Sequence, residues 1–227
     1  MRITAEAKSE TKARIVEVAA RLLMADGWNN ATTRGIAAAA GIATGTLFNY
    51  FETKEAIVAE LLSEALQKAQ EEVRKREGDH ESIEEELFSL IWTELRSLKR
   101  FRSFLPAAAE SIFSPMRRST GSGPGESLRA NHLEAVERII LAHGFEGALP
   151  PLTMQLYWTL YLGVFAYWAG DDSPKQEDTL ALLDQSLKLF TAALNQEHQG
   201  EKHHESRSKN SHRGTAARSR KRSSRRS

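Results

Sequence analysis

The fold of this chain is decided by residues 33–51, which read TRGIAAAAGIATGTLFNYF. Apolar residues recur at helical spacing on both sides of Gly41, namely Ile36, Ala37 and Ala40 before it and Leu47, Tyr50 and Phe51 after it. A glycine can adopt the left-handed conformation that ends a helix, and Ile42 supplies an apolar side chain for the angle between two helices. The stretch therefore predicts two short helices joined by a tight corner, which is a helix-turn-helix.

The second of these helices, expected over residues 44–50, has small, polar and flat residues on its outer face. They are Thr44, Gly45, Thr46, Phe48 and Asn49. Hydroxyl groups and free backbone amides donate to phosphate oxygens, while side chains reach base edges, so this face suits DNA. The alternative is two short helices in an ordinary helical core, because alanine-rich helix pairs with a glycine corner are common.

The run AGIATGTLFNYFETKEA, residues 40–56, resembles the helix-turn-helix signature of the TetR-type bacterial transcriptional regulators. The resemblance covers residues 11–58 without a gap, and beyond residue 60 only length and helical character are similar. It implies an all-α protein with an N-terminal three-helix DNA-binding domain and a C-terminal helical domain for ligand binding and dimerisation. It also implies a homodimer that places one copy of the 44–50 helix in each of two major grooves of a pseudo-palindromic operator.

The outer-face pattern and the resemblance together give ten candidate DNA contacts. Contacts with base edges or the groove are expected from Arg34, Thr44, Thr46 and Phe48. Phosphate contacts are expected from Thr32, Asn49, Tyr50 and Lys54, and Thr33 and Gly45 complete the set. Lys54 stands where the family has a phosphate-binding lysine. Gly35 and Ala43 depart from the acidic or larger residue and the capping serine that are usual in the family, which predicts looser helix ends.

Composition favours a cytoplasmic globular protein. Hydrophobic residues make up 41% of the chain and charged residues 27%, as in ordinary soluble domains. The chain has no cysteine, which excludes disulfides, thiolate metal sites and a thiol nucleophile. No apolar run reaches the roughly 18 residues that a membrane span needs, and the first residues lack the apolar core of a signal peptide.

The net charge of +1 hides three parts of different sign. Residues 206–227 carry nine Lys or Arg and no acidic residue, and residues 1–54 carry seven basic and five acidic residues. Residues 55–205 carry fifteen basic and twenty-five acidic residues. The acidic middle part is therefore a poor nucleic-acid binder, whereas the N-terminal part and the tail attract a polyanion.

The chain is expected to divide into four segments. They are a flexible N-terminus over 1–10, the DNA-binding domain over 11–58, the helical domain over 59–196 and a disordered basic tail over 197–227. The first helix of the DNA-binding domain is expected to end at Gly27. Thr32 and Thr53 are placed to cap the helices that follow them. From Thr53 to Glu77 neither glycine nor proline interrupts, so one long helix should link the two domains.

The helical domain should contain four further helices and, on either side of Pro106, two shorter pieces over 101–105 and 107–113. Ser82 opens a capping box for the first, and Pro106 breaks the stretch that follows it. Residues 114–126 are rich in glycine and proline and predict a flexible loop, after which residues 128–143 form a helix. The helix over 152–169 is apolar on all sides and should be buried on all sides. Pro174 begins the last helix.

Aromatic residues suggest a ligand cavity in this domain. Six of the seventeen aromatic residues lie between Tyr157 and Trp168, and all of them except Tyr167 fall on the side of that helix opposite its small residues. The cavity is expected to bind a small apolar or aromatic effector between Phe88, Trp92, Phe104, Phe113, Tyr157, Trp158, Tyr161 and Phe165. The alternative is that these rings only fill the core.

The last helix carries an apolar seam made of Leu180, Leu183, Leu187, Phe190 and Leu194. We expect the last two helices to pair with those of a second chain in a four-helix dimer interface, as the resemblance implies. The alternative is that the seam covers the core of its own domain.

The tail beyond Glu197 is rich in His, Ser, Lys and Arg and is expected to be disordered. It is either a solvated appendage or an arm that adds non-specific DNA affinity. Its histidines, His198, His203, His204 and His212, are not expected to form a metal site, and no cofactor is expected.

The sequence thus predicts a DNA-binding regulator, and most simply a ligand-responsive repressor. One alternative is a non-specific or architectural nucleic-acid binder driven by the tail. Another is an enzyme with an acidic helical domain. The second alternative is disfavoured because the chain lacks a glycine-rich phosphate loop, a His-x-x-x-His pair, cysteine and a nucleophile-elbow sequence.

Overall fold

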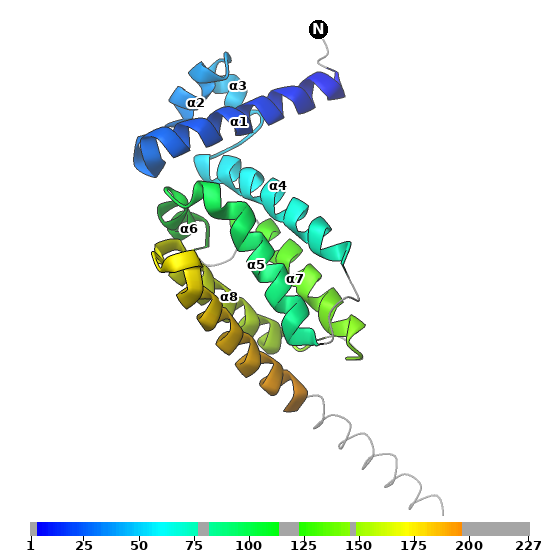
Figure 1. The fold of residues 1–227 in the computed structure, drawn as a ribbon. Coiled ribbons are helices and arrows are strands. Elements are labelled where there is room, and N and C mark those ends of the chain that lie inside the picture. Colours follow the sequence, from blue (N-terminus) through cyan, green and yellow to red (C-terminus); the bar gives the residue numbers. More distant parts are fainter. Residues whose placement is uncertain (1–3, 77–81, 114–122, 146–148, 197–227) are drawn as a thin grey trace, which may run out of the picture.

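The computed structural model describes residues 4–76, 82–113, 123–145 and 149–196. Within these ranges every regular element is helical, and Figure 1 shows a small N-terminal group of helices set on a larger bundle. The all-α class expected from the sequence is confirmed. The predicted basic tail, with its four histidines, lies outside the described residues.

The first helix, α1, spans Ala5–Asn30 and is longer than expected at both ends. It includes residues 5–10, which we expected to be irregular, because the Thr4 hydroxyl accepts a hydrogen bond from the Ala7 N–H at 3.3 Å and caps the helix. Gly27, with φ +78° and ψ 173°, is not helical, so the first regular stretch ends there as predicted and the chain continues across a kink. One further turn follows the kink.

The predicted corner lies between α2 (Thr33–Ala39) and α3 (Thr44–Phe48). Gly41 has φ +68°, and its N–H donates to the Ala38 carbonyl at 3.1 Å. The Ile42 N–H donates to the Ala37 carbonyl at 3.0 Å, which completes a Schellman motif. The α3 helix is shorter than the expected 44–50 helix, and the side chain of Leu47 is fully buried beneath it.

The long helix predicted after Thr53 is α4, Lys54–Arg74, and the Thr53 hydroxyl caps it by accepting from the Ala56 N–H at 3.1 Å. Its 21 residues correspond to a length of roughly 32 Å. It contacts α1 and also α5, α6 and α7 of the larger bundle (Figure 1). One continuous helix therefore joins the N-terminal group to the rest of the described chain.

The larger bundle follows from the predicted caps and breaks. Its elements are α5 (Ile83–Leu98), the 3-10 turn η1 (Lys99–Phe101), α6 (Leu105–Phe113), α7 (Pro124–Ala142), α8 (Pro151–Gly170), the 3-10 turn η2 (Pro174–Gln176) and a final helix over 177–196. Ser82 caps α5 by accepting from the Glu85 N–H at 3.2 Å, and Pro106 is the second residue of α6. The predicted cap is confirmed, but the interruption falls before Leu105 and not at Pro106, because a proline fits the first turn of a helix.

The start of α7 was predicted too late. Residues 124–126, which we expected in a loop, belong to this helix, because Pro124 is well suited to a first helical turn. Gly125 allows the helix to approach α6, since a Cβ at this position would lie 2.6 Å from the Ile112 carbonyl oxygen. Residues 114–122 of the predicted loop lie outside the described part of the chain.

A carboxylate organises the turn between α8 and the final helix. Asp171 accepts from the Ser173 N–H at 2.8 Å, from the Thr179 N–H at 3.0 Å and from the Thr179 hydroxyl. These hydrogen bonds, led by those from Ser173 and Thr179, hold the pKa of the Asp171 carboxyl well below its usual range. The turn thus fixes where the final helix begins.

The apolar seam of the final helix packs inside its own chain. Leu183, Leu187, Phe190 and Leu194 are all exposed by 3% or less. The alternative reading, in which the seam covers the domain core, is confirmed, and these side chains are not free for a dimer interface. The expected burial of α8 on all sides is also wrong for a single chain, because its small residues Gly163, Ala166 and Gly170 are exposed.

The Gly41 corner can be tested by comparing two glycine substitutions. We expect Gly41→Ala to lower the free energy of unfolding by about 1–2 kcal/mol, because an L-residue is strained at positive φ. Gly45→Ala should leave stability unchanged or raise it by up to about 1 kcal/mol, because an added Cβ meets nothing within 4 Å. Urea unfolding followed by circular dichroism measures both, and equal loss in the two variants would contradict the assignment of the corner.

Candidate functional site

The outer face of α3 is presented to solvent. Phe48 is 47% exposed, and Gly45 and Asn49 are also exposed, whereas Leu47 on the opposite side is fully buried. Thr44, Thr46 and Tyr50 are half-buried. The corner therefore holds α3 with its apolar side inward and the predicted contact residues outward.

The N-terminus of α2, the helix that precedes α3 in the chain, is also accessible to a DNA phosphate. The Thr32 hydroxyl oxygen accepts from the Gly35 N–H at 3.0 Å, so the predicted cap is formed even though residue 35 is a glycine. The hydroxyl hydrogen of Thr32 is not used in that bond and can be donated. Arg34 is exposed and Thr33 is half-buried, so the predicted candidates around this helix end are accessible in different degrees.

Lys54 has a structural role that its sequence position did not reveal. Its ammonium donates to the Trp28 carbonyl at 2.6 Å and to the Ala31 carbonyl at 3.1 Å, and it lies 4.0 Å from the centroid of the Trp28 ring. Desolvation lowers the pKa of Lys54, and nearby Glu55 opposes that shift. Two of the three ammonium protons are thus bound within the chain, and one remains for a phosphate.

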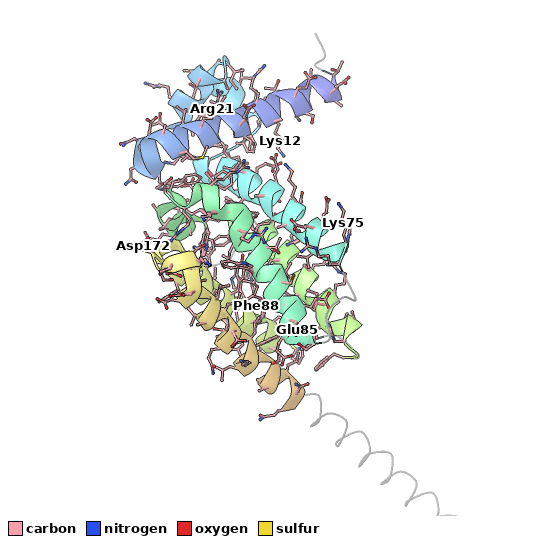
Figure 2. All side chains as sticks on the ribbon, viewed as in Figure 1. Lys12, Arg21, Lys75, Glu85, Phe88 and Asp172 are labelled. Atoms are coloured by element: carbon pink, nitrogen blue, oxygen red, sulfur yellow. The ribbon has the colours of Figure 1, made fainter. Side chains whose placement is uncertain are left out.

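Lys12 provides a second tie between the N-terminal helices and α4. It forms an ion pair with Glu60 and lies 5.7 Å from the centroid of the Phe51 ring. Figure 2 shows Lys12 on α1 beside α4. Lys12 and Lys54 together fix the first turns of α4 against the helix-turn-helix.

The structure brings four of the eight predicted cavity residues together. Phe113, Trp158, Tyr161 and Phe165 line a closed cavity with Leu62, Leu66, Leu98, Leu128, His132 and Leu162. The cavity has a volume of about 10 Å³, which is the space of about one water molecule. An effector of the predicted kind therefore requires these side chains to move apart.

The other four predicted cavity residues lie elsewhere. Phe88 and Trp92 line an open groove of about 510 Å³ together with charged residues of α5 and the final helix, such as Glu84 and Asp184. Figure 2 shows Phe88 and Glu85 on α5. Phe104 is buried in the core, and Tyr157 is buried against His132 and Phe190.

A buried polar network that the sequence analysis missed adjoins the closed cavity. The Glu94 carboxylate, which has no exposed surface, accepts from Gln70 Nε2 at 2.8 Å and lies 2.9 Å from His132 Nδ1. It also accepts from the Tyr161 hydroxyl at 3.3 Å, and His132 Nε2 lies 3.1 Å from the Tyr157 hydroxyl oxygen. The network joins α4, α5, α7 and α8.

Both tyrosines of this network remain protonated. Desolvation, followed by the charge of Glu94, raises the pKa of Tyr157 and that of Tyr161 well above 10. Tyr161 can therefore act only as a neutral phenol that donates to the carboxylate.

A periodicity signal could have found this network. Glu94 falls on the apolar stripe of α5, three residues after Ile91 and four before Leu98, and His132 follows Leu128 by four on the buried side of α7. A charged residue inside an apolar stripe is buried with a partner or disrupts the helix packing. The partner could not be named, since it lies 38 positions away in the chain.

Among the described residues, no group of three or more His, Cys, Asp or Glu side chains could hold a metal ion. No helix in the described part of the chain is long and apolar enough to cross a membrane.

The structural role of Lys54 predicts a stability effect in the absence of DNA. We expect Lys54→Met to lower the free energy of unfolding by about 1–2 kcal/mol, because two backbone carbonyls lose their donor. Lys8→Met, at an exposed position of α1, is the control and should change stability little. Thermal unfolding measures both; an unchanged Tm for Lys54→Met would leave the lysine without a structural role.

Comparisons with known proteins agree with this geometry. The family model described as bacterial regulatory proteins, tetR family, matches residues 15–61. This range contains the Gly41 corner, α2 and α3. No curated protein matches the chain.

Solved structures share the fold over most of the chain. FadR of Thermus thermophilus, a TetR-family transcriptional repressor solved in complex with lauroyl-CoA, has a TM-score of 0.62 and 22% identity, covering 79% of this chain and 93% of that one. A TetR regulator from Rhodococcus sp. RHA1 has a TM-score of 0.62 and 16% identity, covering 81% and 97%. One from Nitrosomonas europaea has a TM-score of 0.60 and 20% identity, covering 80% and 98%. The N-terminal part of this chain thus matches the tetR family of bacterial regulatory proteins, and most of the chain shares the fold of TetR-family structures.

Proposed function

We propose that this protein is a ligand-responsive repressor that binds a pseudo-palindromic operator as a homodimer. The observation that carries the proposal is the exposed outer face of α3, held by the Gly41 corner inside the region that matches the family. Each protomer places α3 in a major groove, and the end of α2 faces a backbone phosphate. The two half-sites then lie roughly 34–36 Å apart or somewhat more.

An unpartnered apolar face supports the homodimer. Leu152, Leu156 and Tyr167 of α8 are 83%, 47% and 47% exposed, and Leu189 of the final helix is 60% exposed. Between them on α8 lie exposed small residues, among them Gly163, where an added Cβ would meet nothing within 4 Å. Such a face is unusual on a monomer, and its small residues allow two helices to approach closely around a two-fold axis.

The cavity supports regulation by an effector. Leu62 and Leu66 in its wall belong to α4, and the N-terminal end of α4 is tied to the helix-turn-helix by Lys12 and Lys54. A ligand that widens the cavity shifts α4 and changes the distance between the two α3 helices of a dimer. Release of DNA by a factor of 100 requires about 2.7 kcal/mol of differential affinity between the two states.

The DNA-reading role of α3 predicts a loss of affinity without a loss of stability. DNA fragments selected by the purified protein supply the operator. On it, the double variant Thr46→Ala/Phe48→Ala should bind about 10- to 100-fold more weakly than the wild type, because groove contacts are removed. Fluorescence anisotropy at one fixed salt concentration measures this.

The control for this experiment is Lys188→Ala, an exposed position on the final helix, which should bind normally. Retention of full operator affinity by the double variant would remove α3 as the reading element. Loss of all selective binding on deletion of residues 206–227 would instead favour the tail-driven alternative.

The apolar face of α8 predicts the oligomeric state. Gly163→Arg places a charged side chain in the middle of that face, where the isolated protomer has room for it, so the chain should fold but dissociate to monomers. Analytical ultracentrifugation measures the change. Glu134→Arg, at an exposed position of α7, adds the same side chain elsewhere and should leave the dimer intact. A wild-type monomer, or a Gly163→Arg dimer, would contradict this interface.

A further inference from the structure

The wall of the closed cavity is apolar. It consists of leucine side chains and the rings of Phe113, Trp158, Tyr161, Phe165 and His132, and none of these described residues exposes a polar atom to the cavity. No Lys or Arg belongs to the wall. Arg129 lies outside the wall, 6.0 Å from the centroid of the Trp158 ring; one Nη of its guanidinium donates to Gln155 at 2.7 Å, and its Nε is buried without a partner among the described residues. The imidazole of His132 also belongs to the wall, but its Nδ1 contacts Glu94 and its Nε2 contacts the Tyr157 hydroxyl, so it offers no free donor to an ionised group in the cavity.

A carboxylate lies directly behind this apolar wall. Glu94 contacts Tyr161 and His132, which both line the cavity, and it has no exposed surface. Its two oxygens already accept from Gln70, His132 and Tyr161. The carboxylate is thus satisfied within the protein and adds negative charge beside the cavity without offering a donor to a ligand.

We infer that this cavity selects an uncharged apolar or aryl molecule, and that Glu94 excludes the anionic analogue of the same shape. An uncharged ligand gains from burial of its apolar surface, whereas a carboxylate loses its hydration without gaining a partner. It is also repelled by Glu94 in a medium of low dielectric constant. The inference deepens the proposed effector function by naming the chemical class of the effector.

The same contacts indicate which wall residue moves when the cavity widens. The hydrogen bond from Tyr161 to Glu94, at 3.3 Å, is the longest that the carboxylate accepts. Tyr161 is also a wall residue, so its displacement enlarges the cavity. Gln70 and His132 keep the carboxylate bonded when Tyr161 moves.

The test compares two probes of the same shape, 2-acetylnaphthalene and 2-naphthoate, by calorimetric titration of the full chain without DNA. At about pH 7.5 only the second probe is charged. We expect the ketone to bind at least about 100-fold more tightly than the naphthoate. In Glu94→Gln, the affinity for naphthoate should rise at least about tenfold and that for the ketone should stay within about threefold.

Two matched controls fix the cause and the place of binding. Glu134→Gln removes one charge at an exposed position of α7 and should leave the ratio of the two affinities unchanged. Leu128→Trp fills the cavity and should abolish binding of the ketone, whereas Leu141→Trp, at an exposed position of the same helix, should not. Circular dichroism establishes that each variant folds. If Glu94→Gln fails to fold, the ratio of the two affinities in the wild type and the result for Leu128→Trp test the inference instead.

Three results would overturn the inference: naphthoate binding as tight as that of the ketone, an unchanged ratio in folded Glu94→Gln, or no binding of the ketone at millimolar concentration. Because no DNA is present, a failure to find an operator would leave these titrations intact. Conversely, failed titrations would leave operator binding by α3 untouched. The two proposals therefore fail separately.

Discussion

The structure depends on α4 being packed against two groups of helices at once. Nine of its side chains are buried, from Ile57 near its start to Val73 near its end, and it contacts α1 on one side and α5, α6 and α7 on the other. Burial of this kind stabilises each group by about 1.5–3 kcal/mol for every large apolar side chain. Because one rigid helix satisfies both groups, neither can change its position relative to α4 without exposing part of this surface.

Those parts of the fold that local chemistry determines could be predicted from the sequence. Thr32, Thr53 and Ser82 cap helices as expected, because a capping hydroxyl acts on an N–H only three residues away. Gly41 adopts positive φ because a Schellman corner needs it. The same local logic gave the exposed candidates of α3, such as Phe48. The cap at Thr4 is equally local, but it was not predicted because residues 5–10 show no helical repeat of apolar side chains.

What depends on partners distant in the chain could not be predicted. The seam of the final helix and the exposed Leu189 both fit a helical pattern, and only the packed bundle shows which side faces the core. The predicted cavity was divided for the same reason, since Phe88 and Trp158 lie on helices whose relative rotation no periodicity specifies. Lys54 lies where a phosphate contact was expected. Its two carbonyl partners, in Trp28 and Ala31, follow the kink at Gly27, and the sequence did not predict that kink.

The buried network around Glu94 is better explained by geometry than by stability. A buried carboxylate with its polar partners often contributes no more than apolar residues of the same volume, because desolvation offsets the attraction. Its hydrogen bonds are directional, however, and they hold Gln70 of α4, His132 of α7 and Tyr161 of α8 at fixed positions around one carboxylate. Leucines at the same positions would allow small rotations and slides between these helices. In the proposed function, α4 passes the state of the cavity to α3, and this requires discrete helix positions, which the hydrogen bonds around Glu94 would supply.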